Sequence, residues 1–206
     1  MRSNTISRRS FVMTAMAGLG AGLGAGLVPM PALALTEQSA RALVDEVVAN
    51  INQVIASGKS QNAMIKDFER IFVRYADVPI MARYALGPDA RTASRSQLRS
   101  FTTAFQSYIS RKYGRRFREF VGGRVEVKST RKIKAGYEIR STAYLQGQAP
   151  FEVTFLVSDK SGSEKFFNMF IEGVNLLLTE RTEIGAMLDQ RKGNLDQLIK
   201  DLPKAG

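Results

Sequence analysis

The hydrophobic period of this sequence changes once, at Gly122-Gly123, and that change limits the folds it can adopt. Before this point apolar residues recur every three or four positions, as on one face of an α-helix. After it they alternate with polar residues, which is typical of strands with one buried face. The sequence therefore predicts a helical half at about 37–120 and a strand half at about 123–173, in an α+β architecture.

Four helices are expected in the helical half. Apolar stripes predict amphipathic helices at about 37–57 and 60–75. Asp77-Val78-Pro79 then has the pattern of a helix cap followed by proline in the first turn, so a short third helix should begin there. The fourth helix, long and starting near residue 94, is expected to fray or bend at Gly114.

Four strands are expected after the glycine pair, because four segments alternate in hydrophobicity. Their inward residues are Val125 and Val127; Tyr137, Ile139, Ala143 and Leu145; Phe151, Val153, Phe155 and Val157; and Phe167, Met169 and Ile171. Short glycine-containing turns separate these segments, which predicts a four-stranded twisted antiparallel meander covered on one face by the helices. The last strand is expected to continue into Ile171-Glu172-Gly173-Val174, and C-terminal helices should occupy about 176–202.

Residues 1–34 have the features of a twin-arginine signal peptide. Arg8-Arg9 precedes an apolar run rich in glycine and alanine, and Ala32-Leu33-Ala34 matches an A-x-A cleavage site. We expect cleavage after about Ala34, leaving a single domain at 35–206 in the periplasm. Three of the 30 Lys and Arg residues and none of the 19 Asp and Glu residues lie in the signal, so the domain carries a formal charge of +8.

The residue types available argue against an enzyme. The chain has no Cys and no His, which removes thiol nucleophiles and the commonest general base and metal ligand. It also has no nucleophile elbow, P-loop or zinc-protease motif. Asp77 with Tyr75 and Tyr84 is the one acidic and aromatic group that could serve an apolar active site, and Asp77 is better explained as a helix cap. We therefore expect no catalysis, no cofactor and no metal.

A basic stretch at Arg111–Arg118 is interrupted by Tyr113 and Phe117. Such a pattern can bind nucleic acid in a cytoplasmic protein. Behind an export signal, a transient contact with an anionic membrane surface or an acidic partner fits better, so no nucleic-acid partner is expected. The simplest explanation remains a solvated helix face with two buried aromatic side chains.

The C-terminal part of the chain contains its most specific motif. Ile171-Glu172-Gly173-Val174 is followed by Arg181, eight residues after the glycine, and by Gly193 before the closing helix. Matching positions upstream are Phe68, Tyr75 to Asp77, and Ala85 to Gly87. Together they resemble the MlaC or toluene-tolerance family, periplasmic phospholipid-binding proteins that are auxiliary components of an ABC transporter.

The resemblance implies a fold and a function. In this family the twisted sheet and its covering helices enclose a deep apolar cavity that takes phospholipid tails and leaves the headgroup near solvent. The chain would then shuttle glycerophospholipid, with two acyl tails, between membranes and so maintain outer-membrane lipid asymmetry. Its implied partners are an inner-membrane ABC transporter complex and an outer-membrane lipoprotein–porin complex. Arg181 is expected either to be a structural anchor or to lie near a phosphate, and we favour the anchor.

The candidate lipid-binding residues are large apolar or aromatic side chains from both halves. From the helices they are Phe72, Tyr75, Ile80, Tyr84, Phe101, Phe105 and Tyr108. From the sheet they are Val153, Phe155, Val157, Phe167, Met169, Ile171 and Val174. The sequence does not separate cavity-lining members from core-filling ones, and it leaves open a binder of another apolar molecule, sterol-like or a solvent molecule.

Overall fold

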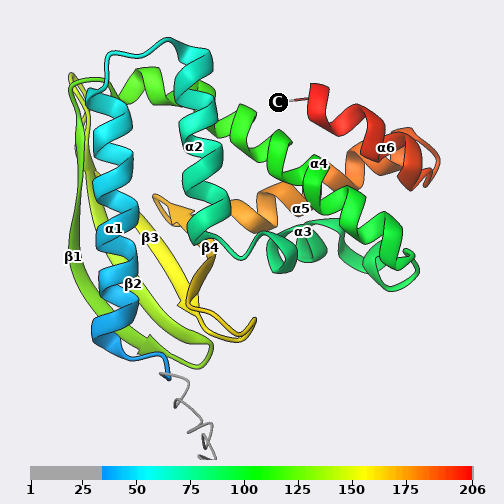
Figure 1. Ribbon diagram of the computed structural model, residues 1–206, viewed down its shortest axis with the longest axis horizontal. Coiled ribbons are helices and arrows are strands. Elements are labelled where there is room, and N and C mark those ends of the chain that lie inside the picture. The colour runs from blue at the N-terminus through cyan, green and yellow to red at the C-terminus, as the bar shows by residue number, and fades with distance from the viewer. Residues whose placement is uncertain (1–33, 206) are drawn as a thin grey trace, which may run out of the picture. The chain divides into compact units, whose positions relative to one another are not determined.

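The computed structural model describes residues 34–205, which belong to one compact unit (Figure 1). The predicted signal peptide, apart from Ala34, lies outside the described residues. Within the described range the helices are α1 Glu37–Ala56, α2 Gln61–Tyr75, α3 Val78–Leu86, α4 Arg95–Gly114, α5 Leu176–Gln190 and α6 Leu195–Asp201, with short 3-10 helices η1 Gly87–Arg91, η2 Arg115–Phe120 and η3 Leu202–Lys204. The strands there are β1 Arg124–Ile133, β2 Gly136–Tyr144, β3 Phe151–Ser158, β4 Lys165–Ile171 and β5 Val174–Asn175. None of these helices combines the length and apolar character needed to cross a bilayer.

The strands form one sheet in the order β1-β2-β3-β4-β5, and each is antiparallel to the next. The α+β class and the antiparallel meander predicted from the sequence are thereby confirmed. The β1–β2 turn ends at Gly136, whose φ is 142°. A Cβ there would lie 2.0 Å from the carbonyl oxygen of Val157, so only glycine lets β2 approach β3 this closely.

The prediction of four strands is wrong, because the described sheet has a short fifth one. Glu172 and Gly173 both have positive φ, 51° and 78°, as the two central residues of a type I′ hairpin turn do. The chain therefore folds back after Ile171, and Val174 pairs with it. The motif that looked like a straight strand end is a tight hairpin that leads directly into α5.

The predicted inward position of Phe167 is also wrong, because β4 contains a bulge. Leu156 pairs with Asn168, whereas the next residue of β3, Val157, pairs with Phe166. One extra residue on β4 reverses the side-chain alternation beyond that point. Phe166 is consequently buried at 3% exposure, and Phe167 is only partly buried.

The outer edge of the sheet, β1, has two irregular features. The register shifts between Val127 and Ser129, so Lys128 is an extra residue on this strand. Near the start of the strand, the side-chain amide of Asn52 from α1 donates to the carbonyl oxygen of Val125 at 3.2 Å. The Asn52 carbonyl also accepts from the Val125 N–H at 3.0 Å, so one side chain satisfies both backbone groups.

The helices cover one face of the sheet and continue beyond it. α1 lies along β1, β2 and β3, and α2 packs between α1 and α4 (Figure 1). Side-chain caps at Thr36, Ser60 and Ser94 fix the starts of α1, α2 and α4. The long α-helix α4 ends at Gly114, where a fray or bend was expected, and the chain continues as η2.

Helix α4 joins the sheet region to a helical lobe. Near its start, Gln97 donates to Asp196 of α6 at 3.2 Å, and further along Gln106 donates to Glu69 of α2 at 3.0 Å. Helix α3 packs against both α4 and α5. The Arg181 guanidinium of α5 lies 5.3 Å from the ring centre of Tyr84 of α3. This contact ties α5 to α3, in agreement with an anchoring role for the arginine.

Candidate functional site

A cavity of about 470 Å³ lies between the covered face of the sheet and the helices α1, α2 and α4. Its volume is within the range of pockets that bury most of a small ligand. The start of α5 and the 3-10 helix η2 complete its wall. Aliphatic and aromatic side chains dominate the lining, so the cavity suits an apolar ligand.

The sheet wall is built by paired residues of β3 and β4. Val153 pairs with Ile171 and Phe155 with Met169, so these side chains lie beside one another on the covered face. The Phe155 and Phe166 rings meet edge to face, with centres 5.7 Å apart. Strand alternation places every second side chain of β3 on this face, and the bulge in β4 brings Phe166 onto it as well.

The helix walls use residues spaced by about one turn. Phe105, Ile109 and Tyr113 of α4 recur every four residues and therefore share one face of that helix. Phe68 and Phe72 of α2 have the same spacing, and their rings stack with centres 6.1 Å apart. Each helix thus turns one apolar stripe toward the sheet, and the cavity lies between these stripes and the sheet.

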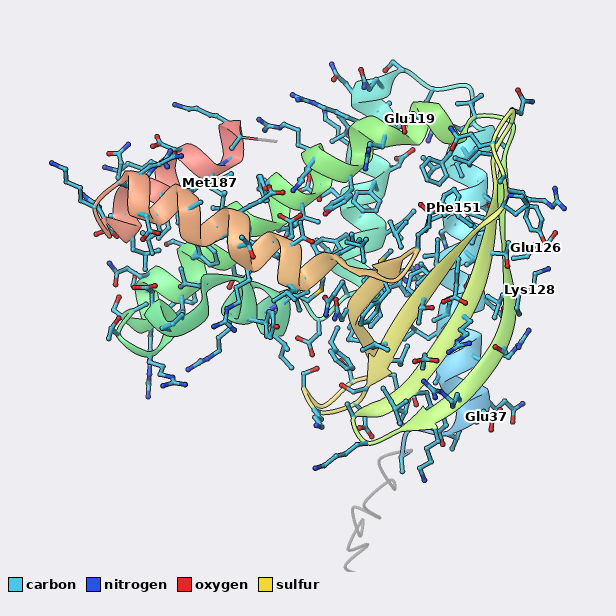
Figure 2. The ribbon with its side chains drawn as sticks, turned by 180° about the vertical axis from the view of Figure 1, so that it is seen from behind. Glu37, Glu119, Glu126, Lys128, Phe151 and Met187 are labelled. Carbon is cyan, nitrogen blue, oxygen red and sulfur yellow. The ribbon has the colours of Figure 1, made fainter. Side chains whose placement is uncertain are left out.

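The cavity opens to solvent at one end. The lining residues that are exposed mark this mouth, namely Arg116 and Glu119 of η2, Gln148 and Ala149 of the β2–β3 turn, and Glu172 of the β4–β5 turn. Figure 2 shows Glu119 on η2 and Phe151 at the start of β3. The deep wall is mostly apolar, with Asn168 and Glu180 as buried polar members, and the rim carries exposed charges, so an amphipathic ligand would keep its polar end at the mouth.

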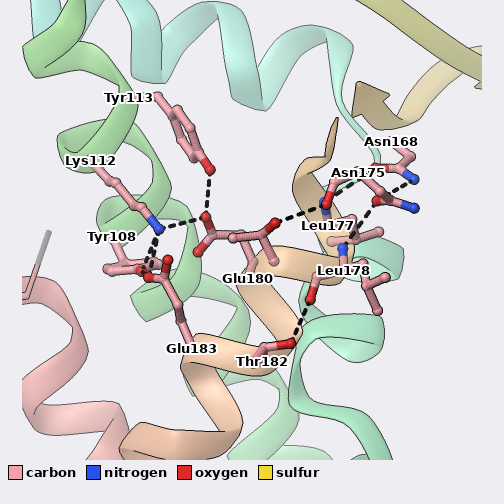
Figure 3. Close-up of polar contacts among 11 residues, drawn as sticks. Tyr108, Lys112, Tyr113, Asn168, Asn175, Leu177, Leu178, Glu180, Thr182 and Glu183 are labelled. Carbon is pink, nitrogen blue, oxygen red and sulfur yellow. Dashed lines mark hydrogen bonds and ion pairs between the residues drawn. The ribbon is translucent and has the colours of Figure 1, made fainter. Parts of the chain in front are cut away.

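A group of charged and phenolic side chains connects α4 to α5 at the cavity wall (Figure 3). The Lys112 ammonium donates to Glu180 at 2.8 Å and to Glu183 at 2.6 Å. The Tyr113 hydroxyl donates to the same Glu180 oxygen at 2.5 Å, and the Tyr108 hydroxyl donates to Glu183 at 2.9 Å. We call these five residues the polar cluster. Of them, only Tyr113 and Glu180 line the described part of the cavity.

The two tyrosines and the lysine of the polar cluster keep their protons at neutral pH. Burial, followed by the neighbouring Glu180 carboxylate, raises the pKa of both Tyr108 and Tyr113 far above the usual tyrosine value. Burial opposes the charge on Lys112, but hydrogen bonds to Glu180 and Glu183 outweigh it and raise the pKa of the lysine. At neutral pH the cluster therefore contains two neutral phenols, one ammonium and two acidic side chains.

Some residues proposed from the sequence come together at the cavity and others do not. Those that line it are Phe72, Phe105, Val153, Phe155, Met169 and Ile171. Their contact with a lipid stays a prediction, but the structure shows that helix and sheet members face one space. Four of the six come from β3 and β4, where strand alternation sets the direction of each side chain.

Two of the proposed tyrosines, together with Phe101 and Val157, are buried away from the described lining. The Tyr75 hydroxyl contacts Glu46, at 3.1 Å, and Tyr75 borders a separate polar cavity of about 330 Å³ between α1 and α2. Tyr108 belongs to the polar cluster. Phe101 and Val157 are fully buried in the core instead of bordering the space.

The other proposed residues lie on the surface or on the outer face of β4. Ile80 and Tyr84 are exposed on α3, and Val174 is exposed on the β4–β5 hairpin. The bulge in β4 turns Phe167 away and puts Phe166 in its place. Phe167 differs because the bulge changes the face on which it lies. Ile80, Tyr84 and Val174 differ because the sequence period identifies a face but does not say what covers it.

Several lining residues were not proposed from the sequence. Val47 and Ile51 of α1 and Ile109 of α4 lie on stripes that were recognised as helical, so their periodicity could have nominated them. Glu180 gives no such signal, because an isolated acidic residue in a helix is normally on the surface. Only the structure shows that it is buried, at 2% exposure.

The acidic and aromatic group considered for catalysis does not converge. Asp77 caps α3 by accepting from the Ile80 N–H at 3.3 Å, as predicted. The Tyr75 hydroxyl bonds to Glu46, whereas Tyr84 packs against Arg181. Within the described residues there is also no group of three or more acidic, His or Cys side chains that could hold a metal ion.

The basic stretch at Arg111–Arg118 divides between α4 and η2. Lys112 is engaged in the polar cluster, and Arg115 and Arg116 are exposed. Tyr113 is half-buried at the cavity wall. This position agrees with the predicted solvated helix face whose aromatic side chains point inward. The side chains of Phe117 and Arg118 lie outside the described part of the chain.

Comparisons with known proteins agree with this geometry. No curated protein matches the sequence significantly. The structure resembles that of a phospholipid-binding protein from Ralstonia solanacearum in complex with a phospholipid, with a TM-score of 0.66 and 20% sequence identity over 83% of this chain and 96% of that one. At this identity the likeness shows a shared fold. The sequence model of the MlaC protein family matches residues 41–204. The chain therefore belongs to the MlaC family.

Proposed function

We propose that this protein binds a glycerophospholipid in its cavity and carries it between the outer and inner membranes, which maintains the lipid asymmetry of the outer membrane. The observation that carries the proposal is the apolar cavity with a charged mouth, which matches the two ends of a phospholipid. Membership of the MlaC family and the phospholipid complex of the structural neighbour support the same ligand class. The activity is binding and release, with no chemical step.

Energetics favour a carrier over a tight receptor. Moving two acyl tails out of water, roughly 30 methylenes at about 0.8 kcal/mol each, is worth on the order of 24 kcal/mol. That exceeds the practical ceiling of non-covalent affinity, about 18–21 kcal/mol. The tails of a lipid in a bilayer are already buried, however. The relevant quantity is therefore the difference between the free energy of the lipid in the cavity and its free energy in the membrane. A wall of Phe, Val, Met and Ile nearly matches the bilayer interior, and small contributions from partners can then set the direction of transfer.

Identification of the bound molecule tests the proposal. Protein purified from the periplasm is extracted with organic solvent, and the extract is analysed by mass spectrometry. We expect two-tailed glycerophospholipid at a stoichiometric amount. A sterol-like compound, a solvent molecule or an empty protein that takes no lipid from vesicles would contradict the proposal.

A pair of matched variants tests the location of the ligand. Ile171→Trp places a large ring in the cavity from a partly exposed position, so the strain on the fold is limited. Ile80→Trp makes the same change on the exposed face of α3. We expect the first variant to lose most of its bound lipid and the second to keep it, with both folded by circular dichroism. Equal lipid content in the two would place the ligand elsewhere.

Export and partners form the last part of the proposal. We propose a twin-arginine signal cleaved after about Ala34, delivery to the periplasm, and docking to an inner-membrane ABC transporter complex and an outer-membrane lipoprotein–porin complex. Replacing Arg8-Arg9 with two lysines should keep the protein in the cytoplasm. Cross-linking in intact cells should yield adducts with both membrane complexes; adducts with neither would remove the shuttle from the proposal.

A further inference from the structure

Four exposed apolar side chains lie on two segments that pack against each other. Among the described residues six large apolar side chains are exposed, and four of them are Ile80 and Tyr84 of α3, Val174 of the β4–β5 hairpin and Leu178 of α5. Their exposure is between 38% and 55%. Single apolar residues on a surface are normal, whereas a contiguous group marks a binding surface.

Arg181 joins the two segments into one surface. Its guanidinium lies 5.3 Å from the ring centre of Tyr84, and Leu178 precedes it by three residues on the same side of α5. Helices α3 and α5 also pack against each other (Figure 1). Ile80 lies one turn before Tyr84 on α3. We define the apolar–basic surface as Ile80, Arg83, Tyr84, Val174, Leu178 and Arg181.

The charge of the apolar–basic surface suits an anionic partner. Arg83 is exposed on α3 and makes no ion pair with a described residue. No acidic side chain is exposed in α3 or between Val174 and Thr182, and Glu172 flanks the surface at the cavity mouth. The domain has an excess of Lys and Arg over Asp and Glu, so a second copy of this chain would be repelled.

The shape of the apolar–basic surface favours a bilayer over a protein. None of its six residues borders either of the two cavities described above. Protein partners gain most of their affinity from anchor side chains that fill pockets, whereas a fluid bilayer adapts to protruding side chains. Tyrosine and arginine also suit the bilayer interface, because each has an apolar body and a polar end that stays among the headgroups.

We infer that the apolar–basic surface docks on a bilayer that contains anionic phospholipid. Ile80, Tyr84 and Leu178 enter the boundary between headgroups and acyl chains, and the two arginines bind lipid phosphates. The basic stretch at Arg111–Arg118 is not needed for this contact, because Lys112 is engaged in the polar cluster. The inference goes beyond the proposed function, since a protein can dock on a bilayer without carrying lipid.

The docked bilayer would lie against the outer side of the cavity wall. Leu176 and Leu177 line the cavity, whereas Val174 and Leu178 of the same short segment are exposed. Glu172, two residues before Val174, belongs to the mouth. Docking therefore brings the mouth and one wall of the cavity close to the membrane, while the apolar interior stays covered.

A single introduced tryptophan reports insertion, because the chain has no Trp of its own. Tyr84→Trp keeps an aromatic ring beneath Arg181. Tyr144→Trp is the matched control, since the Arg124 guanidinium lies 4.3 Å from that ring centre and the residue is far from α3 in sequence. The mature protein is titrated with vesicles of phosphatidylglycerol and phosphatidylcholine in equal amounts, or of phosphatidylcholine alone. We expect a blue shift, and quenching by brominated acyl chains, only for Tyr84→Trp with the anionic vesicles.

Substitutions on the surface test which residues contribute, with vesicle flotation as the readout. The double variant Ile80→Gln with Leu178→Gln should bind anionic vesicles at least about ten-fold more weakly. Arg83→Gln should weaken binding about five-fold, and less at high salt. Val121→Gln changes another exposed apolar residue, outside α3 and α5, and should leave binding unchanged. All four positions are exposed, so circular dichroism should show folded variants.

The outcomes separate this inference from the proposed function. Equal emission changes in the two tryptophan variants, or none in either, would overturn the inference. A blue shift of Tyr84→Trp that requires an added membrane protein would assign the surface to a protein partner and overturn it as well. Extraction of lipid from the same preparation reports cargo independently. Cargo without vesicle binding removes only the inference, and vesicle binding without cargo removes only the proposed carriage.

Discussion

Replacing Lys112 with methionine should destabilise the fold through a single buried charge. The ammonium is the cation that balances Glu180, and the substitution keeps the aliphatic part of the side chain. Breaking a buried ion pair by removing one partner costs about 3–5 kcal/mol. The Lys112 side chain is 24% exposed, so water reaches part of the site and the lower end of this range applies, about 3 kcal/mol.

The assay is urea denaturation of the delipidated protein, followed by circular dichroism. In a chain of this size about 3 kcal/mol lowers Tm by roughly 6–12 °C, so a thermal melt should show the same effect. Adding Glu180→Gln to Lys112→Met removes the uncompensated charge, and the double variant should recover part of the loss. A double-mutant cycle then gives the coupling between the two residues.

The chain offers a close control in Lys128. It also pairs with a glutamate, Glu126, and lies over a tyrosine ring, but on the exposed outer surface of β1 (Figure 2). Exposed ion pairs add little to stability. Lys128→Met should therefore leave the urea midpoint unchanged. Equal midpoints for Lys112→Met and the unaltered protein would refute the reasoning, because Glu180 would then need no counter-charge.

Three further predictions follow from burial and backbone geometry. Phe155→Ala removes a ring that is 2% exposed and should cost about 3 kcal/mol in urea, the low end for such a change because it enlarges an existing cavity; no loss would mean that the ring does not pack. Gly136→Ala forces a Cβ against the carbonyl of Val157 at a backbone angle that suits glycine, and should cost about 3 kcal/mol; a loss below about 1 kcal/mol would show that the β1–β2 hairpin can shift. The raised pKa values of Tyr108 and Tyr113 mean that the folded protein keeps protons that the unfolded chain releases above about pH 10, so stability should fall as pH rises beyond that value. In a tyrosinate absorbance titration these two residues should ionise only on unfolding, and early ionisation of all tyrosines would contradict their burial.

The sequence predicts local structure well where one physical signal acts alone. Helix periodicity and the Asp77 cap were expected and are confirmed, and α4 ends at Gly114, where a fray or bend was expected. The residues of β3 were also placed on the correct face, because strand alternation continues without a break through Val153 and Phe155. In these segments neighbouring residues determine the backbone and no distant contact competes.

The cavity could not be predicted at the level of single residues, because its lining depends on long-range contacts. A bulge of one residue puts Phe166, in place of the predicted Phe167, on the cavity face. The local hydrophobic pattern does not predict this bulge. Phe101 and Phe105 lie one turn apart on α4, yet only Phe105 borders the space while Phe101 is buried in the core. Whether a residue borders the cavity depends on which other elements lie opposite it along the helix. The hydrophobic period does not contain that information.

The irregular edge strand β1 bears on how this protein behaves at high concentration. A long free strand edge is a template on which an identical molecule can add its own strand. Here the backbone groups of Val125 are already occupied by the Asn52 amide, and the bulge at Lys128 interrupts the regular spacing that such an addition requires. A second copy adding its strand here would have to displace the Asn52 amide and straighten the bulge, so α1 and the bulge together protect this edge from aggregation.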